Sequence, residues 1–112
     1  LHSVPVSGYS VTIPHKEAAA RAAGDDRDEA VSATGAANTL VRTPGGGFRA
    51  SNTDLAAAVD AIEDGLNGWS RPGAQFTVRN LNVLVLGAGG AARAVAYGLH
   101  KDGARVRLAC RD

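Results

Sequence analysis

The 112-residue sequence predicts an α/β protein, in which short strands and helices alternate before a strand–helix–strand unit of the parallel kind. The apolar run over residues 81–86 is long enough for a buried strand, and a glycine-rich turn over 87–90 follows it directly. A helical stretch over 91–101 and a second strand-like run over 106–110 come next. Because a helix is the usual connection between two parallel strands, these runs predict a βαβ unit.

The first elements are predicted from alternation and from proline. Residues 9–13 alternate enough to form a short strand. Pro14 suits the first helical position, where a missing N–H is tolerated, and an alanine-rich helix is predicted over 15–23. Gly24 ends this helix, and the charged run over 25–29 is expected to be a solvated loop.

The next elements are a hairpin and a longer helix. Strand-like residues 37–41 and 48–51 flank a segment rich in glycine and proline, which predicts a β-hairpin. Apolar residues then recur at helical spacing over 54–66, which predicts an amphipathic helix. The stretch 67–79 lacks such periodicity and is expected to be a linker.

Composition argues against several classes of function. The 12 basic and 11 acidic residues are spread along the chain, and a net charge of +1 leaves no basic stripe for nucleic acid. No apolar run approaches the roughly 18 residues of a membrane span. The single cysteine, Cys110, cannot form an internal disulfide, which favours a cytoplasmic location. His2, His15 and His100 lack the spacing of metal ligands, so no metal site is predicted.

The glycine-rich turn predicts a site for a dinucleotide. Gly87 would permit a tight bend, Gly89 would let the backbone approach a pyrophosphate, and the small Ala92 would allow the helix to pack closely on the strand. Amide N–H groups at the start of the helix would hold the phosphates, because the helix dipole favours negative charge there. The cofactor-binding residues predicted in the turn are Gly87, Ala88, Gly89, Gly90 and Ala91. The alternative is a strand-to-helix turn whose glycines serve packing alone.

Three separated motifs precede this turn. They are Ser10-Val11-Thr12-Ile13-Pro14-His15-Lys16, Gly35-Ala36-Ala37-Asn38-Thr39 and Asn52-Thr53-Asp54. Together with the glycine-rich turn they resemble the shikimate dehydrogenase family, including its quinate/shikimate relatives and its fusions with 3-dehydroquinate dehydratase. The resemblance spans nearly the whole chain. An unrelated dehydrogenase that shares only the turn would not account for the upstream motifs.

The resemblance implies NADP-dependent, reversible reduction of 3-dehydroshikimate to shikimate, a step of chorismate and aromatic amino acid biosynthesis. It implies that Lys16 is the catalytic lysine and that Asp54 holds it in place and bonds a substrate hydroxyl. An ammonium suits this reaction because a ketone that gains hydride develops alkoxide charge. The resemblance further implies that Asn38 binds ring hydroxyls and that Thr12 lies at the substrate carboxylate. Each residue also has a structural interpretation, as a first-turn helix residue or a turn residue.

Arg111 favours NADP as the cofactor. It stands at the end of the last predicted strand, where NADP-using relatives carry an arginine that contacts the 2′-phosphate. Asp112 leaves NAD open as the less favoured alternative, because an acid near this strand end can bind the ribose hydroxyls of NAD.

The resemblance also divides the chain. Residues 1–66 are expected to be the C-terminal part of a substrate-binding catalytic domain, 67–79 a linker, and 80–112 the start of a Rossmann-type NADP-binding domain. A complete fold of that type needs two βαβαβ halves, so the chain is expected to be an internal part of a larger enzyme. Alone it is expected to be inactive and to associate with itself through uncovered apolar surface.

Two residues depart from the family pattern. Ser10 stands where many members have asparagine, and Leu55 replaces the glycine that usually follows Asn-Thr-Asp, which is expected to alter the loop there. A second class of function therefore stays open. It is a non-catalytic relative that keeps the fold and senses a nucleotide or a shikimate-like ligand.

Overall fold

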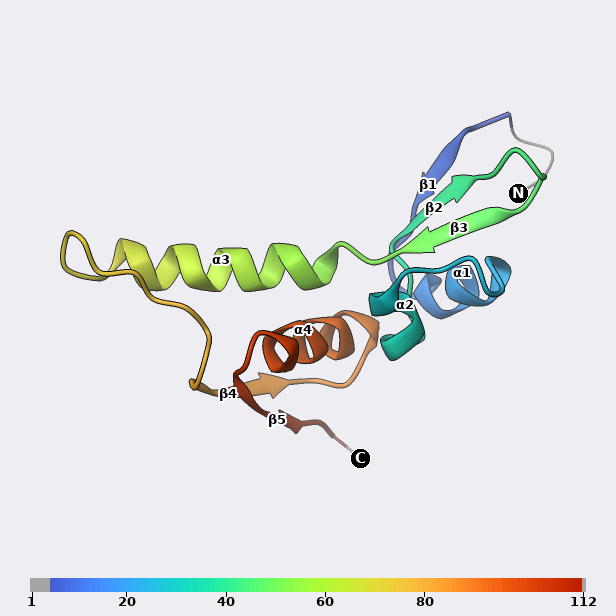
Figure 1. Cartoon of the computed structure of the whole chain (residues 1–112). Coiled ribbons are helices and arrows are strands. Elements are labelled where there is room, and N and C mark those ends of the chain that lie inside the picture. The colour runs from blue at the N-terminus through green and yellow to red at the C-terminus, as the bar shows by residue number, and fades with distance from the viewer. Residues whose placement is uncertain (1–4, 112) are drawn as a thin grey trace. The chain divides into compact units, whose positions relative to one another are not determined.

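The computed structural model describes residues 5–111, and the chain divides into two compact units (Figure 1). The first unit ends at Thr53 and the second begins at Asp54. The order of elements is β1, α1, α2, β2 and β3 in the first unit and α3, β4, α4 and β5 in the second. Both units contain helices and strands, so the predicted α/β class is confirmed.

The first unit contains an antiparallel sheet in the order β1–β2–β3, with β2 in the middle (Figure 1). The strands span Gly8–Ser10, Thr39–Arg42 and Phe48–Ser51 respectively. Strands β2 and β3 form the predicted hairpin, in which Arg42 pairs with Phe48. Thr43 N donates to Gly47 O at 3.0 Å and closes the turn. The hairpin confirms the prediction made from its glycine-rich turn.

Strand β1 and helix α1 differ from their predicted limits. The strand ends at Ser10 rather than at residue 13, because the chain turns where His15 N donates to Thr12 O at 2.8 Å. This turn places Pro14 before the helix rather than in its first position. Helix α1 consequently spans Lys16–Ala22, within the predicted range of 15–23.

The charged run over 25–29 is, up to Asp28, the exposed loop that the sequence predicts. Its side chains are exposed, but Asp28 N donates to Ala50 O at 3.0 Å and Ala50 N donates to Asp26 O at 2.9 Å. The run therefore lies along β3, and a helix that was not predicted, α2 (Glu29–Thr34), follows it. The sequence did not predict the contact with β3, because a charged composition does not reveal backbone hydrogen bonds to a distant strand.

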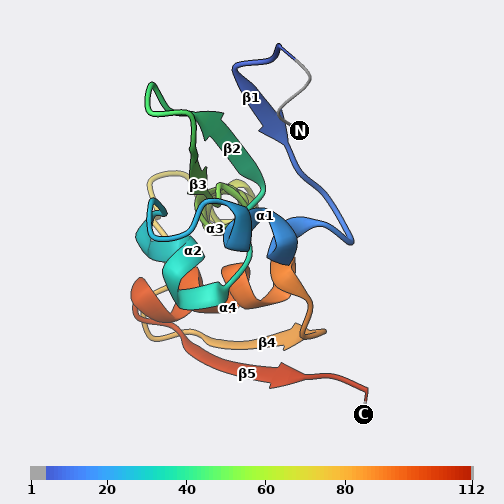
Figure 2. The ribbon, with the colours of Figure 1, turned by 90° about the vertical axis from the view of Figure 1, so that its right-hand side faces the viewer.

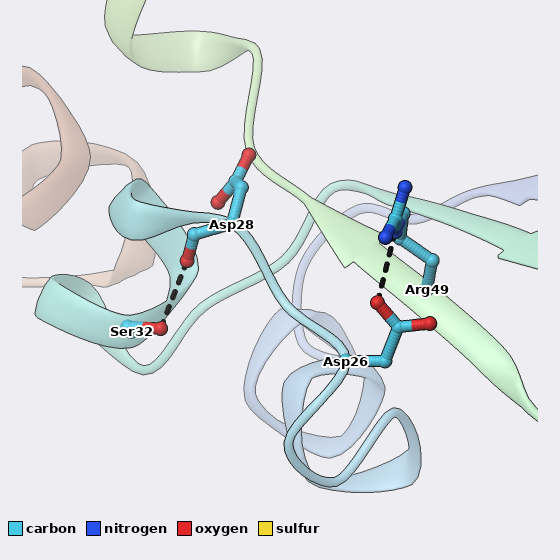
Figure 3. A network of polar contacts seen from close by, with 4 residues as sticks. All are labelled: Asp26, Asp28, Ser32 and Arg49. Atoms are coloured by element: carbon cyan, nitrogen blue, oxygen red, sulfur yellow. Dashed lines mark hydrogen bonds and ion pairs between the residues drawn. The ribbon is translucent and has the colours of Figure 1, made fainter.

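Side chains of the same run add polar contacts (Figure 3). Arg49 Nε donates to Asp26 Oδ1 at 2.8 Å, and this hydrogen bond and the carboxylate charge raise the pKa of Arg49. Ser32 Oγ donates to Asp28 O at 2.9 Å. The Asp28 carboxylate points the other way, toward the segment that leaves β3. Asp28 therefore lies between α2 and that segment.

Small and branched side chains form the core of the first unit. Leu40, Phe48 and Ala50 from the hairpin pack with Val31 of α2 and with the alanines of α1. Tyr9 contacts the Phe48 ring edge-on, with ring centroids 5.8 Å apart. The alanine-rich sequence of α1 allows this helix to lie close to β3.

The second unit contains the predicted βαβ. Helix α3 spans Asp54–Gly68, β4 Asn82–Leu86, α4 Gly90–Lys101 and β5 Arg105–Ala109. Strands β4 and β5 are parallel, and α4 connects them and packs on one face of the pair (Figure 2). Their register runs from Asn82 beside Arg105 to Leu86 beside Ala109. The unit predicted from the C-terminal sequence is confirmed.

Helix α3 packs against α4 and thus belongs to the second compact unit. The core there comprises Val59 of α3, Leu99 of α4, Ala104 and Val78. Val78 lies in the stretch expected to be a linker, yet it is fully buried, and its N–H donates to Glu63 Oε1 at 2.9 Å. The end of this stretch is therefore docked on α3. The division into a substrate-binding domain, a linker and an NADP-binding domain remains a prediction.

Leu55 lies in the first turn of α3 rather than in a loop. It packs against Gly98 of α4, where an added Cβ would stand 2.6 Å from Leu55 Cγ. The leucine that departs from the family pattern thus occupies space that a glycine provides. Among the residues that the structure describes, no helix is both long enough and apolar enough to cross a membrane.

Candidate cofactor and substrate sites

The glycine-rich turn joins the end of β4 to the start of α4. Gly87 has φ of +119°, a backbone angle that residues with side chains rarely adopt, and its N–H donates to Ala109 O at 2.7 Å. Gly89 is the N-cap residue of α4, so the N–H groups of Gly90 and Ala91 belong to the first helical turn. Gly87 therefore forms the predicted bend, and the helix begins at Gly90, one residue before the predicted start at Ala91.

The turn borders a hollow in the second unit. Its volume is about 530 Å³, and its lining comes from Gly87, Ala88 and Gly89 on one side and Cys110 and Arg111 on the other. The side chain of Arg111 is exposed there. The end of β5 thus meets the glycine-rich turn, as the parallel register of β4 and β5 requires.

Gly89 leaves room for a ligand beside the backbone. A Cβ added at Gly89 would meet no atom of the protein within 4 Å. Gly87, Ala88 and Gly89 contribute backbone groups to the lining. Arg111 supplies a guanidinium group, which pairs well with phosphate. Asp112, which bears on the choice between NADP and NAD, lies outside the described residues. The described residues fit a phosphate-bearing dinucleotide.

In the first unit, backbone hydrogen bonds bring together the first two motifs. Ala37 N donates to Lys16 O at 2.9 Å, and Val11 N donates to Asn38 O at 2.7 Å. Lys16 is the first residue of α1 and is half-buried, whereas Thr12 lies in the exposed turn before the helix. The structure therefore gathers Thr12, Lys16 and Asn38, which the sequence proposes for the substrate site, in one region.

The third motif joins them through the carboxamide of Asn38. Asn38 Nδ2 donates to Thr53 Oγ1 at 2.9 Å, and Thr53 N donates to Asn38 Oδ1 at 3.1 Å. Thr39 Oγ1 also donates to Asn38 Oδ1, at 2.9 Å. Asp54 follows Thr53 directly and is the half-buried first residue of α3, in the second unit.

Asp28 and Asn52 support this arrangement, and the sequence analysis did not single out either residue for that task. Asp28 Oδ1 accepts from Val31 N at 2.8 Å as the N-cap of α2, while Oδ2 accepts from Asn52 N at 3.1 Å. Asn52 Nδ2 donates to Ala36 O at 2.9 Å. An aspartate just before Glu29 is an N-cap signal that could have predicted α2. No local signal predicts the contact with Asn52.

A second hollow, of about 480 Å³, lies between β1 and α1. Its lining includes Thr12 and His15 but is mainly apolar, with Val11, Leu40 and the alanines of α1. Lys16 and Asn38 are not in this lining, so the hollow and the cluster around Asn38 are different features. Within residues 5–111, no group of His, Cys, Asp or Glu side chains is placed to hold a metal ion.

The fold and the turn define a class: an α/β protein whose second unit is the opening βαβ of a Rossmann-type nucleotide-binding domain. Over 104 residues the chain is 52% identical to the shikimate dehydrogenase (NADP(+)) of Methanocella arvoryzae, in a match that covers 93% of this chain and 34% of that protein. It is 41% identical over 110 residues to the bifunctional 3-dehydroquinate dehydratase/shikimate dehydrogenase of Arabidopsis thaliana, with 94% of this chain and 18% of that protein covered.

A solved structure agrees with these relatives. Shikimate 5-dehydrogenase from Thermus thermophilus, in complex with NADP(H) and shikimate, matches with a TM-score of 0.75 and 32% identity, over 96% of this chain and 36% of that chain. No protein-family profile matches the chain. The chain spans 34% of the length of the Methanocella enzyme. The resemblance to the shikimate dehydrogenase family is thus confirmed in sequence and in fold, over one segment of these enzymes.

Proposed function

We propose that the complete protein containing this chain is an NADP-dependent shikimate dehydrogenase, which reversibly reduces 3-dehydroshikimate to shikimate. The observation that carries the proposal is the cluster around Asn38, where hydrogen bonds join segments from all three upstream motifs. The same chain holds a glycine-rich turn facing Arg111. A polar substrate cluster and a dinucleotide turn together are what a dehydrogenase of this family needs.

Lys16 is the proposed acid and base. In the direction of reduction its ammonium donates a proton to the carbonyl oxygen, which develops negative charge as hydride arrives at carbon. In the direction of oxidation the neutral amine accepts the hydroxyl proton. Asp54 and Asn38 bind ring hydroxyls, and Thr12 lies at the carboxylate end of the substrate. These roles orient a small ring that carries hydroxyls and one carboxylate.

NADP is the proposed cofactor. When bound, its nicotinamide ring supplies the hydride for reduction or accepts it in oxidation. Backbone groups of Gly87, Ala88 and Gly89, with the helix start at Gly90 and Ala91, hold the pyrophosphate. Arg111 contacts the 2′-phosphate, which NAD lacks.

The first test is oxidation of shikimate by the complete protein, followed at the nicotinamide absorbance, with quinate and NAD as parallel alternatives. We expect activity with shikimate and NADP. Lys16→Ala should then lower kcat by about 10²- to 10⁴-fold, because a general acid and base contributes about that much. Lys101→Ala removes a lysine at the exposed end of α4 and should leave kcat unchanged. Normal turnover in Lys16→Ala would reject the assigned acid and base.

A binding assay distinguishes the enzyme from the ligand sensor. Cys110 is exposed and lines the hollow beside the glycine-rich turn, so bound nucleotide should slow its alkylation by a thiol reagent. Protection by NADP without any turnover, in folded protein, would favour the sensor. Alkylation at the same rate with and without NADP would place the nucleotide elsewhere.

Two further properties belong to the same proposal. We place the complete protein in the cytoplasm, because the single cysteine of these 112 residues needs no oxidising compartment. Fractionation of cells that make the protein would test this location. We also expect the 112-residue chain, made alone, to associate with itself through the exposed leucines of β4, Leu84 and Leu86.

A further inference from the structure

We propose that Thr53 is a positioning residue, which orients the carboxamide of Asn38 toward the substrate. The inference rests on the proposed function, because it gives Thr53 a task in the substrate site of that enzyme. Thr53 and Asn38 lie in the same compact unit, 15 positions apart in the sequence. Two hydrogen bonds of opposite direction join them.

Thr53 contacts the carboxamide through one acceptor and one donor. Its hydroxyl oxygen accepts from Asn38 Nδ2 at 2.9 Å, and its backbone N–H donates to Asn38 Oδ1 at 3.1 Å. If the carboxamide rotated by half a turn, its NH₂ group would face the N–H of Thr53, and two donors would oppose each other. The N–H of Thr53 thus selects one of the two orientations of the amide, and the hydroxyl of Thr53 holds the amide nitrogen in that orientation.

Thr39 adds a further hydrogen bond to the same carboxamide. Its hydroxyl donates to Asn38 Oδ1 at 2.9 Å, so the oxygen receives two hydrogen bonds and both of its lone pairs are used. Under the proposed function the carboxamide, held in this orientation, contacts a hydroxyl group of the substrate ring.

The backbone of Thr53 is held by its neighbour. Asn52 is buried, its N–H donates to Asp28 Oδ2 at 3.1 Å, and its side chain donates to Ala36 O at 2.9 Å. These bonds connect the segment to the start of α2 and to the residues just before Asn38. The hydroxyl of Thr53 therefore stands at a fixed place relative to the carboxamide that it contacts.

The experiment measures KM and kcat for shikimate, together with the shikimate Kd by calorimetry, in the complete protein. Thr53→Val keeps the shape of the side chain and removes the hydroxyl acceptor. We expect a rise in KM and Kd of about fivefold, because a net hydrogen bond is lost, with kcat changed by less than about twofold. Thr53→Ser keeps the hydroxyl and should restore both constants. Thr43→Val makes the same change in the hairpin turn, away from Asn38, and should have no effect.

A second comparison shows whether Thr53 acts through Asn38. In an Asn38→Ala background, Thr53→Val should produce no further rise in KM or Kd. An equal rise in KM and Kd in both backgrounds would overturn the inference. Unchanged KM and Kd in Thr53→Val would also overturn it, as would an equal rise in Thr53→Ser. If Thr53→Val does not fold, Thr53→Ala removes the same acceptor and is compared in its place.

The unsubstituted protein separates this inference from the proposed function. Absence of shikimate oxidation would reject the dehydrogenase, while the Kd comparison would still test Thr53. Normal oxidation with constants that do not respond to Thr53→Val would overturn the inference and leave the dehydrogenase standing. Absence of both oxidation and shikimate binding would reject both.

Discussion

Gly87 illustrates how a single residue meets a requirement of the cofactor turn. Its φ of +119° lies where a Cβ introduces strain, whatever space surrounds it. An added Cβ would stand 3.8 Å from the Cβ of Ala92, which is an ordinary contact. The backbone angle, more than the space, therefore requires glycine at the bend. The small side chain of Ala92 keeps the start of α4 close to the turn.

Arg111 is predicted to determine the preference for NADP over NAD through its guanidinium group. In the complete protein, Arg111→Ala should weaken NADP about tenfold and change the Kd of NAD much less, since only NADP offers a 2′-phosphate to a charged donor. The measurement is titration of both nucleotides by calorimetry. Arg107→Ala removes an exposed arginine within β5 that does not line the hollow, and it should leave the ratio of the two Kd values unchanged. Equal losses for NADP and NAD in Arg111→Ala would contradict the assignment.

Between elements, the contact of α3 with α4 depends on one small residue. Gly98 is buried, and a Cβ there would approach Leu55 Cγ to 2.6 Å, well inside van der Waals contact. Glycine in the middle of a helix costs about 1 kcal/mol relative to alanine. The close fit of Leu55 against Gly98 offsets this cost by letting the two helices approach.

We therefore predict that Gly98→Ala destabilises the second unit by about 1–3 kcal/mol despite its better helix propensity, because the added methyl group overpacks the contact. Combining it with Leu55→Ala should recover about 1–2 kcal/mol of that loss. Unfolding in denaturant measures both changes.

Gly65→Ala provides the matched control for this pair. Gly65 also lies inside a helix, but an added Cβ would meet no atom within 4 Å. This substitution should raise the free energy of unfolding by up to about 1 kcal/mol. If Gly98→Ala stabilised the protein as Gly65→Ala does, the two helices would not be in the contact described.

The second unit as a whole covers only one face of its sheet. Val83 and Val85 of β4 pack with the core, whereas Leu84 and Leu86 on the opposite face are 61% and 78% exposed. Side chains alternate between the two faces of a strand, so these leucines lie on the face away from α4. A buried parallel strand is apolar on both sides, which explains why four of the five residues of β4, all but Asn82, are apolar.

We predict that the isolated 112-residue chain associates with itself through the sheet face that carries Leu84 and Leu86. Sedimentation velocity should show species larger than a monomer, and the double substitution Leu84→Lys with Leu86→Lys should shift the chain to monomer. Trp69→Lys replaces a side chain that is 96% exposed but lies outside the sheet, and it should leave the distribution unchanged. A monomeric unsubstituted chain would contradict the expectation.

The elements that the sequence predicted well have strong local patterns. The apolar runs of β4 and β5, the glycine-rich turn, the glycines of the hairpin and the helical periodicity of α3 are each read within a few residues. For the candidate site, the same patterns predicted the bend at Gly87, whereas the N-cap position of Gly89 is a finding of the structure. The roles of Lys16, Asp54, Asn38 and Thr12 came from the resemblance to a family and stay predictions.

Contacts between distant positions could not be read from these patterns. Asp28 binds the backbone of Asn52 across 24 positions, and Asn38 binds Thr53 across 15. Leu55 meets Gly98 only because α3 folds back on α4. Local periodicity and turn chemistry determine which segments become helices and strands, because they act between near neighbours. The partners of each polar side chain depend on how those segments pack, which the order of residues along the chain does not specify locally.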